Sequence, residues 1–245
     1  MKKIIVLLSL SLILVLISIT PLFQIAREMV VGQGILDRYE IHHAYKDDQG
    51  WEDIVDTQEL HIQNVMIEII EVPTGKKAPL TPWDEDENVP PGDIVDVHIL
   101  VNGEEITEPA EIWLSNRARG SRYFSWLDVV TVKDRETDKT QINIIQRLTD
   151  DDQPMEDRKW KIISISENGE KMTEEILTYK DRSENKLGVR LVNFTNTGLM
   201  SMGYYSDITH GYPSLFFPFL YPMLTCVVGI VLLIISSVRL YKRRG

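Results

Sequence analysis

Residues 215–238 read LFFPFLYPMLTCVVGIVLLIISSV, a run without a charged side chain that is followed closely by Arg239 and Lys242. As a helix this run extends for about 36 Å, which is enough to cross a hydrocarbon core of about 30 Å. A second apolar run, residues 4–23, follows Lys2 and Lys3 near the other end of the sequence. The two runs predict transmembrane α-helices at residues 1–23 and 215–238, with a polar body between them and a basic tail at residues 239–245.

Charge divides sharply between the ends and the body. Six of the 26 Lys and Arg residues lie at the two ends, whereas all 37 Asp and Glu residues lie in the body, which therefore carries a formal charge of −17. Because Lys and Arg beside a span are retained on the cytoplasmic side, we expect a two-span protein of the cell membrane with both termini cytoplasmic and the central domain extracytoplasmic. An acidic body also argues against nucleic acid as a partner, since nucleic acid attracts Lys and Arg.

The first apolar run is compatible with a retained signal anchor or with a cleaved signal peptide. The run ends in Ser18, Ile19, Thr20 and Pro21. This sequence does not have the A-x-A-like arrangement of small residues that a signal-peptide cleavage site needs. This favours a retained anchor, and cleavage remains the alternative. Either outcome leaves the same external domain.

The body is predicted to be mainly β. Residues 24–59 form a membrane-proximal segment, in which a short helix continues from the first span and is expected to end at Gly32 and Gly34. From residue 60 to residue 211, short β-branched runs alternate with turn signals, which is typical of an antiparallel sandwich or a barrel-like domain. The expected strands are residues 60–72, 93–101, 104–115, 122–132, 140–148, 159–166, 176–180 and 187–194.

Alternation along these strands predicts their buried faces. Apolar residues at every second position of residues 93–101 share one face. The same reasoning places Trp126 and Val130 on one face, and it predicts one buried and one wet face for residues 140–148. In residues 187–194, Leu191 is expected to lie opposite Arg190 on a strand.

Basic residues are densest around Gly120, at Arg117, Arg119 and Arg122. Such a cluster suits an acidic partner surface, a wall polymer or anionic headgroups. The alternative is a hairpin loop whose charges are neutralised by neighbouring acids. These three arginines are the candidate partner-binding residues.

Aromatic and basic residues flank the second span. Tyrosine favours the membrane interface, where its ring meets the headgroups and its hydroxyl stays hydrated. The predicted interface residues are Tyr204, Tyr205, Tyr212, Tyr221, Arg239 and Lys242. Pro218 and Pro222 lack the N–H that a helix needs, so the straight part of the second helix is expected to start late, near Met223.

No pattern in the sequence predicts a catalytic residue, a cofactor or a metal site. The only cysteine, Cys226, lies in the second apolar run, where a thiolate is disfavoured, and it leaves the outer domain without an internal disulfide. His42 and His43 are adjacent and have no ligand partner at a metal-site spacing, so we expect a solvated pair. The acidic runs 84–87 and 150–152 are expected to be solvated loops rather than Ca²⁺ sites.

These features predict a non-enzymatic binding or assembly module that acts as an accessory subunit of a cell-envelope complex. Its expected partners are the lipid bilayer and a membrane or envelope protein. Gly229, Ser236 and Ser237 are small enough for close contact with another helix, although they are equally compatible with lipid. Two alternatives stay open: an extracytoplasmic hydrolase with an unrecognised carboxylate pair, and a sensor whose β domain binds a small ligand.

Overall fold

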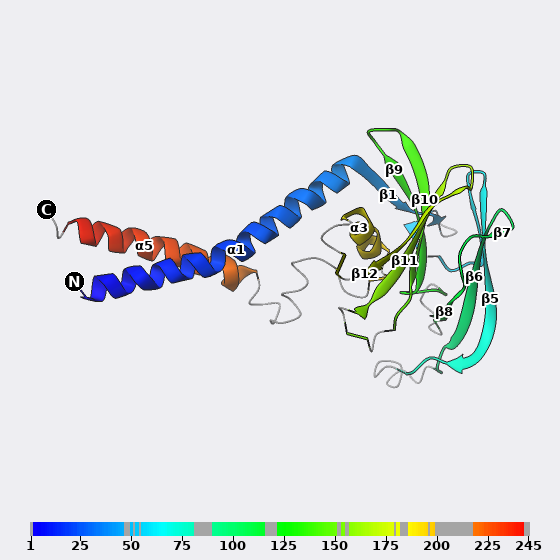
Figure 1. The fold of residues 1–245 in the computed structure, drawn as a ribbon, viewed down its shortest axis with the longest axis horizontal. Coiled ribbons are helices and arrows are strands. Elements are labelled where there is room, and N and C mark those ends of the chain that lie inside the picture. Colours follow the sequence, from blue (N-terminus) through cyan, green and yellow to red (C-terminus); the bar gives the residue numbers. More distant parts are fainter. Residues whose placement is uncertain are drawn as a thin grey trace. The chain divides into compact units, whose positions relative to one another are not determined.

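The computed structural model describes residues 2–46, 50, 52–53, 55–80, 90–115, 122–150, 153–154, 157–178, 180–181, 186–195, 197–198 and 218–242. The protein divides into two compact units. One unit spans residues 1–33 and 203–245 and contains a pair of helices, and the other spans residues 34–202 and contains a β domain (Figure 1).

The β domain contains two antiparallel sheets and one short two-stranded pair. The inner sheet has the strand order β1-β9-β10-β11-β12, and the outer sheet has the order β4-β5-β6-β7, with β8 also paired to β6. Strands β2 and β3 pair with each other. The strands are β1 (Tyr39–His43), β2 (Tyr45–Lys46), β3 (Glu52–Asp53), β4 (Glu59–Ile62), β5 (Val65–Lys77), β6 (Asp93–Val101), β7 (Glu104–Glu105), β8 (Ala110–Trp113), β9 (Leu127–Asp134), β10 (Lys139–Arg147), β11 (Lys159–Ser166) and β12 (Lys171–Thr178).

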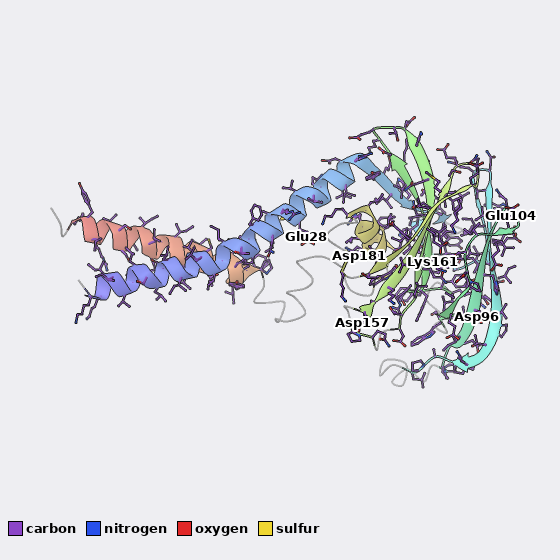
Figure 2. The ribbon with its side chains drawn as sticks, viewed as in Figure 1. Glu28, Asp96, Glu104, Asp157, Lys161 and Asp181 are labelled. Atoms are coloured by element: carbon purple, nitrogen blue, oxygen red, sulfur yellow. The ribbon has the colours of Figure 1, made fainter. Side chains whose placement is uncertain are left out.

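The helix α3 (Lys186–Phe194) covers the face of the inner sheet that points away from the outer sheet. The domain therefore has three layers in the order α3, inner sheet, outer sheet. In Figure 2, Asp181 lies on the α3 side of the domain and Glu104 lies on the opposite side. The predicted β-rich body with an antiparallel sandwich is confirmed at this level, with a helix added on one face.

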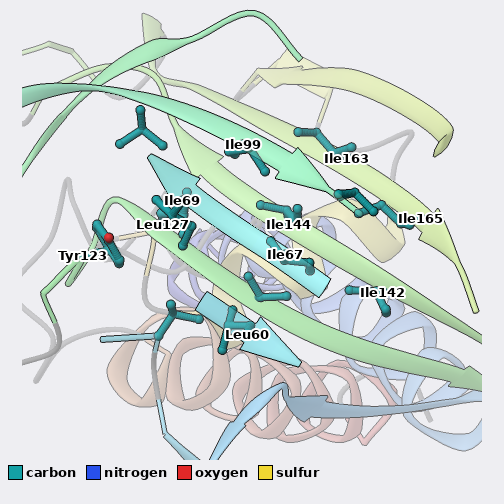
Figure 3. Packing of buried hydrophobic residues seen from close by; sticks show 14 of the residues in the cluster. Leu60, Ile67, Ile69, Ile99, Tyr123, Leu127, Ile142, Ile144, Ile163 and Ile165 are labelled. Atoms are coloured by element: carbon teal, nitrogen blue, oxygen red, sulfur yellow. The ribbon is translucent and has the colours of Figure 1, made fainter. Parts of the chain in front are cut away.

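One hydrophobic core lies between the two sheets. Ile67 and Ile99 of the outer sheet and Leu127 and Ile144 of the inner sheet are fully buried in it (Figure 3). The predicted shared face of residues 93–101 is confirmed, since Val95, Val97, Ile99 and Val101 all belong to this core. Burying apolar surface in this core drives the two sheets together.

A second core lies between the inner sheet and α3. It joins Trp160 and Ile162 of β11 to Leu191 and Val192 of α3. The strand predicted at residues 187–194 is therefore wrong. Leu187, Leu191 and Phe194 recur at helical spacing and pack on one face, which a strand cannot arrange.

Strand β10 is buried on both faces, so the predicted wet face of residues 140–148 is also wrong. Asn143, Gln146 and Arg147 are at most 1% exposed. The polar side chains lie inside because the outer sheet covers one face of β10 and α3 packs against the other. Ser164 Oγ donates to Asn143 Oδ1 at 2.8 Å, which satisfies part of this buried polar surface.

Trp126 and Val130 do not share a face, contrary to the prediction for residues 122–132. Trp126 packs in the core between the sheets, whereas Val130 packs beneath α3. The reason is local, since residues 122–126 form a turn and β9 begins only at Leu127. Alternation holds within β9 but does not extend back through the turn.

The expected strand at residues 60–72 is split into a hairpin. A turn at Gln63, whose φ is 55°, separates β4 from β5. Strand β5 then passes Pro73 and Gly75, where prediction placed its end, and continues to Lys77. A register shift between Pro73 and Lys76 accommodates the interruption against β6.

Helix α1 (Lys2–Arg38) continues through Gly32 and Gly34, which were expected to end it. Glycine lowers helix propensity by about 1 kcal/mol but does not forbid a helix. The last turn is held by the β9–β10 hairpin, where the Arg135 N–H donates to the Arg38 carbonyl at 2.8 Å. The Arg38 guanidinium also lies 2.8 Å from Asp134 Oδ2.

The second apolar segment contains the irregular turn η3 (Phe219–Leu224) and the helix α5 (Thr225–Tyr241). Tyr221 has non-helical φ and ψ values of −130° and 130°, and the straight helix follows it. The late start predicted near Met223 is confirmed to within two residues, since the straight helix begins at Thr225. Both apolar segments, Lys2–Arg38 and Phe219–Tyr241, are long and apolar enough to cross a membrane, by length and composition.

Candidate functional site

The helix pair is joined by buried residues that recur every seven positions on both partners. A seven-residue repeat keeps one side of a helix turned toward its neighbour. The buried residues at this spacing are Ile4, Ser11, Ser18 and Ile25 on α1, and Pro222, Gly229 and Ser236 on η3 and α5. Four of these seven are Ser or Gly, whose small side chains let helix backbones approach closely in a membrane.

The two helices approach each other closely at Gly229. A Cβ added there would lie 2.9 Å from Val15 Cγ2 and 3.1 Å from Leu14 Cβ. Gly229 therefore makes the close helix contact that its small size allows. Ser236 is buried in the same unit, whereas Ser237 is exposed.

Two polar contacts also join the helices. Ser18 Oγ and Thr225 Oγ1 lie 2.9 Å apart, and the Tyr221 hydroxyl donates to the Ile17 carbonyl at 2.8 Å. Ser18 Oγ also donates to the Leu14 carbonyl of α1 at 2.8 Å, and Thr225 Oγ1 donates to the Pro222 carbonyl of η3 at 2.9 Å. In hydrocarbon such groups have no water to bind, so pairing across the helices stabilises the contact.

Among the predicted interface residues, Tyr221 makes this interhelical bond. Arg239 lies in the last turn of α5 and Lys242 directly follows the helix, and both are exposed. Tyr204, Tyr205 and Tyr212 lie outside the described residues.

Arg122, one of the three candidate partner-binding arginines, is engaged by Glu71. Its Nε and Nη2 donate to the two carboxylate oxygens of Glu71, each at 2.6 Å, and the Tyr123 hydroxyl donates to the same carboxylate at 2.8 Å. The Arg122 guanidinium lowers the pKa of Glu71, and burial raises the pKa of Tyr123. Arg117 and Arg119 lie outside the described residues.

For Arg122 alone, this arrangement resembles the alternative in which nearby acids neutralise the arginines. A bidentate Arg–carboxylate pair ties the turn before β9 to β5 in the opposite sheet. Glu71 lies 51 positions from Arg122, so no local pattern pointed to it.

His43 pairs with a buried carboxylate, a contact that sequence reasoning missed. Its Nδ1 lies 3.0 Å from Asp128 Oδ2, and Asp128 is fully buried. Phe194 of α3 stacks on the imidazole with ring centroids 4.6 Å apart. The solvated pair expected at His42 and His43 is thus correct for His42, which is exposed beside Glu40, and wrong for His43.

Asp128 is held by several donors. Its Oδ1 accepts the Val129 N–H at 2.8 Å, and the Val55 N–H also bonds to its side chain. Burial nevertheless raises the pKa of Asp128, and the His43 contact offsets only part of that shift. The pair links β1, β9 and α3, and its geometry suits a structural anchor because the imidazole is confined between a carboxylate and a ring.

A third buried polar group lies between β11 and the β7–β8 connection. Lys161 Nζ donates to Thr107 Oγ1 at 3.0 Å and to the Glu108 carbonyl at 2.7 Å. Burial lowers the pKa of Lys161. The bonds fasten the connection to the inner sheet and give Lys161 a structural role.

The described residues contain no group of three or more His, Cys, Asp or Glu side chains that could hold a metal ion. Of the two acidic runs, residues 84–87 and 151–152 lie outside the described part of the chain. Cys226 lies in α5.

No protein-family model, curated protein or solved structure matches this chain. Functional evidence therefore comes from the packing of the helix pair and from the surfaces of the β domain.

Proposed function

We propose that this protein is a membrane-anchored binding or assembly module that serves as a non-enzymatic accessory subunit of a cell-envelope complex. The observation that carries the proposal is the pairing of α1 and α5 through buried residues seven positions apart. A pair of this kind forms a two-helix anchor, and the chain between the two helices folds into one β domain.

The anchor supports a binding role because it restricts where the domain acts. Two tethers keep the β domain beside one membrane, which raises its effective concentration for a partner in the same membrane. The outward faces of α1 and α5 remain broadly apolar, with Leu16, Val227 and Ile234 each about half exposed, as lipid or a helical partner requires.

The charge distribution supports the orientation. Lys2, Lys3, Arg239 and Lys242 stand at the outer ends of the two apolar segments, and the acids lie between those segments. In the proposed topology the basic ends are cytoplasmic and the acidic domain is extracytoplasmic.

Cysteine labelling tests the orientation. In a Cys226→Ser background, Glu104→Cys places a thiol on an exposed β7 position, and Lys242→Cys places one after α5. A membrane-impermeant maleimide added to sealed cells should label the first variant and should label the second only after permeabilisation. Labelling in the reverse order contradicts the proposed topology.

Purification of the full-length protein from its own membrane in mild detergent tests the accessory role. We expect it to elute with a second protein in constant ratio, at a mass well above that of the 28.2 kDa chain. Elution of the chain alone from intact membranes contradicts the role. Hydrolytic turnover that depends on a pair of its carboxylates would favour the hydrolase alternative, and saturable binding of a small molecule would favour the sensor.

A further inference from the structure

We infer that the outward face of the outer sheet is a docking surface for a protein whose contact surface has an aliphatic centre and a rim of Lys and Arg. This inference rests on the proposed binding function and assigns it a location and a partner chemistry. The surface, called the outer face below, is formed by the side chains of β5 and β6 that point away from the core between the sheets.

Strand alternation defines the outer face. Because Ile69 and Ile99 point into the core, their neighbours on β5 and β6 point outward. Ile70 and Val72 are 45% and 44% exposed on this face. Ile70 lies opposite His98 in the register, so Leu100 is its diagonal neighbour on β6.

The centre of the outer face is aliphatic. Ile70 has Val72 as an outward neighbour on β5 and Leu100 as its diagonal neighbour on β6, whereas Glu68 separates Met66 from this group. His98 lies opposite Ile70, and its Nδ1 lies 2.7 Å from Glu105 Oε1. Single exposed aliphatic residues are common, but a contiguous group with a polar rim is typical of a protein interaction site. The α3 helix covers the other outward side of the sandwich, whereas in Figure 2 Asp96 lies on the side away from α3.

The rim is acidic. Glu68 lies opposite Leu100, and Asp96 lies opposite Val72 and Glu111. Lys76 forms an ion pair with Glu111, and the charge of Asp96 also raises the pKa of Lys76, so this one cation is shared by two carboxylates. Within the described residues, Glu68 forms no ion pair. Docking removes water from the Glu68 and Asp96 carboxylates, so a favourable partner must supply cations at the same positions.

Charge complementarity excludes the other occupants. A second copy docked through the same face would place Glu68 and Asp96 against carboxylates, and anionic headgroups or nucleic acid would meet the same repulsion. A protein surface with an apolar centre and flanking Lys or Arg would place apolar groups against Ile70 and cations against Glu68 and Asp96.

The test uses the full-length protein in its native membrane with a photoreactive amino acid at position 70. The control places the same group at position 172, because Met172 is 58% exposed but lies on β12, in the other sheet. We expect a protein adduct at position 70 only. The adducted partner peptide, sequenced by mass spectrometry, should carry Lys or Arg beside aliphatic residues.

Charge reversal then tests the rim. Glu68→Lys combined with Asp96→Lys should lower the adduct yield about tenfold, which corresponds to about 1.4 kcal/mol. Asp157→Lys combined with Glu170→Lys makes the same change in net charge at exposed positions elsewhere and should leave the yield unchanged. Lys→Glu or Arg→Glu changes in the identified partner peptide should restore the yield with the reversed face.

A salt titration of the original protein gives a second readout that needs no charge variant. Exposed charge pairs are screened at about 1 M salt, so the yield at position 70 should fall. An adduct with the chain itself or with lipid, an acidic partner peptide, a salt-independent yield, or no adduct at position 70 overturns the inference. An adduct at position 172 alone overturns the docking surface while leaving the proposed binding function in place.

Discussion

Gly229 of α5 packs directly against Val15 of α1, so closely that a Cβ at Gly229 would stand 2.9 Å from Val15 Cγ2. A side chain at this position must push the helices apart or force Val15 into another rotamer. The helix pair thus depends on a glycine, and this dependence can be tested by substitution.

Gly229→Leu should separate the helices. In a Cys226→Ser background, Ser18→Cys with Thr225→Cys replaces hydroxyls that lie 2.9 Å apart, so oxidation should form an interhelical disulfide. Adding Gly229→Leu should slow this crosslinking about tenfold, consistent with the loss of about 1 to 2 kcal/mol of helix association. The matched control is Gly32→Leu, because an added Cβ at Gly32 meets no atom within 4 Å. Equal crosslinking rates in the two leucine variants would contradict the observed packing.

Glu71→Gln should destabilise the β domain by about 1 to 2 kcal/mol at neutral pH, a value kept low because the Arg122 side chain is 43% exposed. The pKa of Glu71 lies below its ordinary value of 4.5 in the folded protein. Its stabilising contribution is therefore present above that value and is lost as pH falls through the folded-state pKa. Urea unfolding of the full-length protein in detergent can be followed by tryptophan fluorescence between pH 7 and pH 3. The difference in free energy of unfolding between Glu71→Gln and the original protein should become smaller as the pH falls. Glu170→Gln is the exposed control, and a gap that does not change with pH would refute the assignment.

Asp128→Asn should show the opposite pH trend. Burial raises the pKa of Asp128 above its ordinary value of 3.8, so its protonated form is favoured in the folded state. The associated stability is fully present below that value and is lost as pH rises through the folded-state pKa. In the same urea experiment, the free energy of unfolding of the original protein should exceed that of Asp128→Asn by more at pH 3 than at pH 7. A gap that shrinks on acidification, as expected for Glu71→Gln, would contradict the buried environment of Asp128.

Leu191→Ala should destabilise the domain by about 3 kcal/mol, because it leaves a cavity between α3 and the inner sheet. Leu191 is 2% exposed, and the control Met172→Ala removes a side chain that is 58% exposed and should change stability by less than about 0.5 kcal/mol. Urea midpoints of the two variants provide the comparison. Equal midpoints would argue against α3 as a packed layer.

Features that depend on one stretch of chain were predictable from the sequence. The two apolar helices follow from the length and hydropathy of residues 4–23 and 215–238, and the late start of α5 follows from Pro222. Strand β6 was predicted together with its buried face. Successive side chains of a strand point to opposite faces, so alternating apolar residues indicate one buried face. Each of these properties is set by neighbours along the chain.

Predictions failed where a distant element changed the surroundings of a local pattern. Residues 187–194 contain apolar positions that fit a strand or a short helix, and the inner sheet beneath them decides for the helix. Strand β10 alternates like a half-wet strand, yet it is central in a sheet covered on both sides. An alternating pattern cannot distinguish water from a second buried layer that satisfies polar groups.

By itself, the sequence determined that this protein has two apolar helices, a strongly acidic body between them and a β-rich fold, because hydropathy, charge and alternation act at short range along the chain. Only the tertiary structure decided that Gly229 meets Val15, that Glu71 binds Arg122, that Asp128 holds His43, and that Ile70 lies on an acidic outer face. Each of these relationships joins residues far apart in the sequence or on different strands. Their partners are chosen by the packing of whole helices and sheets, which no single stretch encodes.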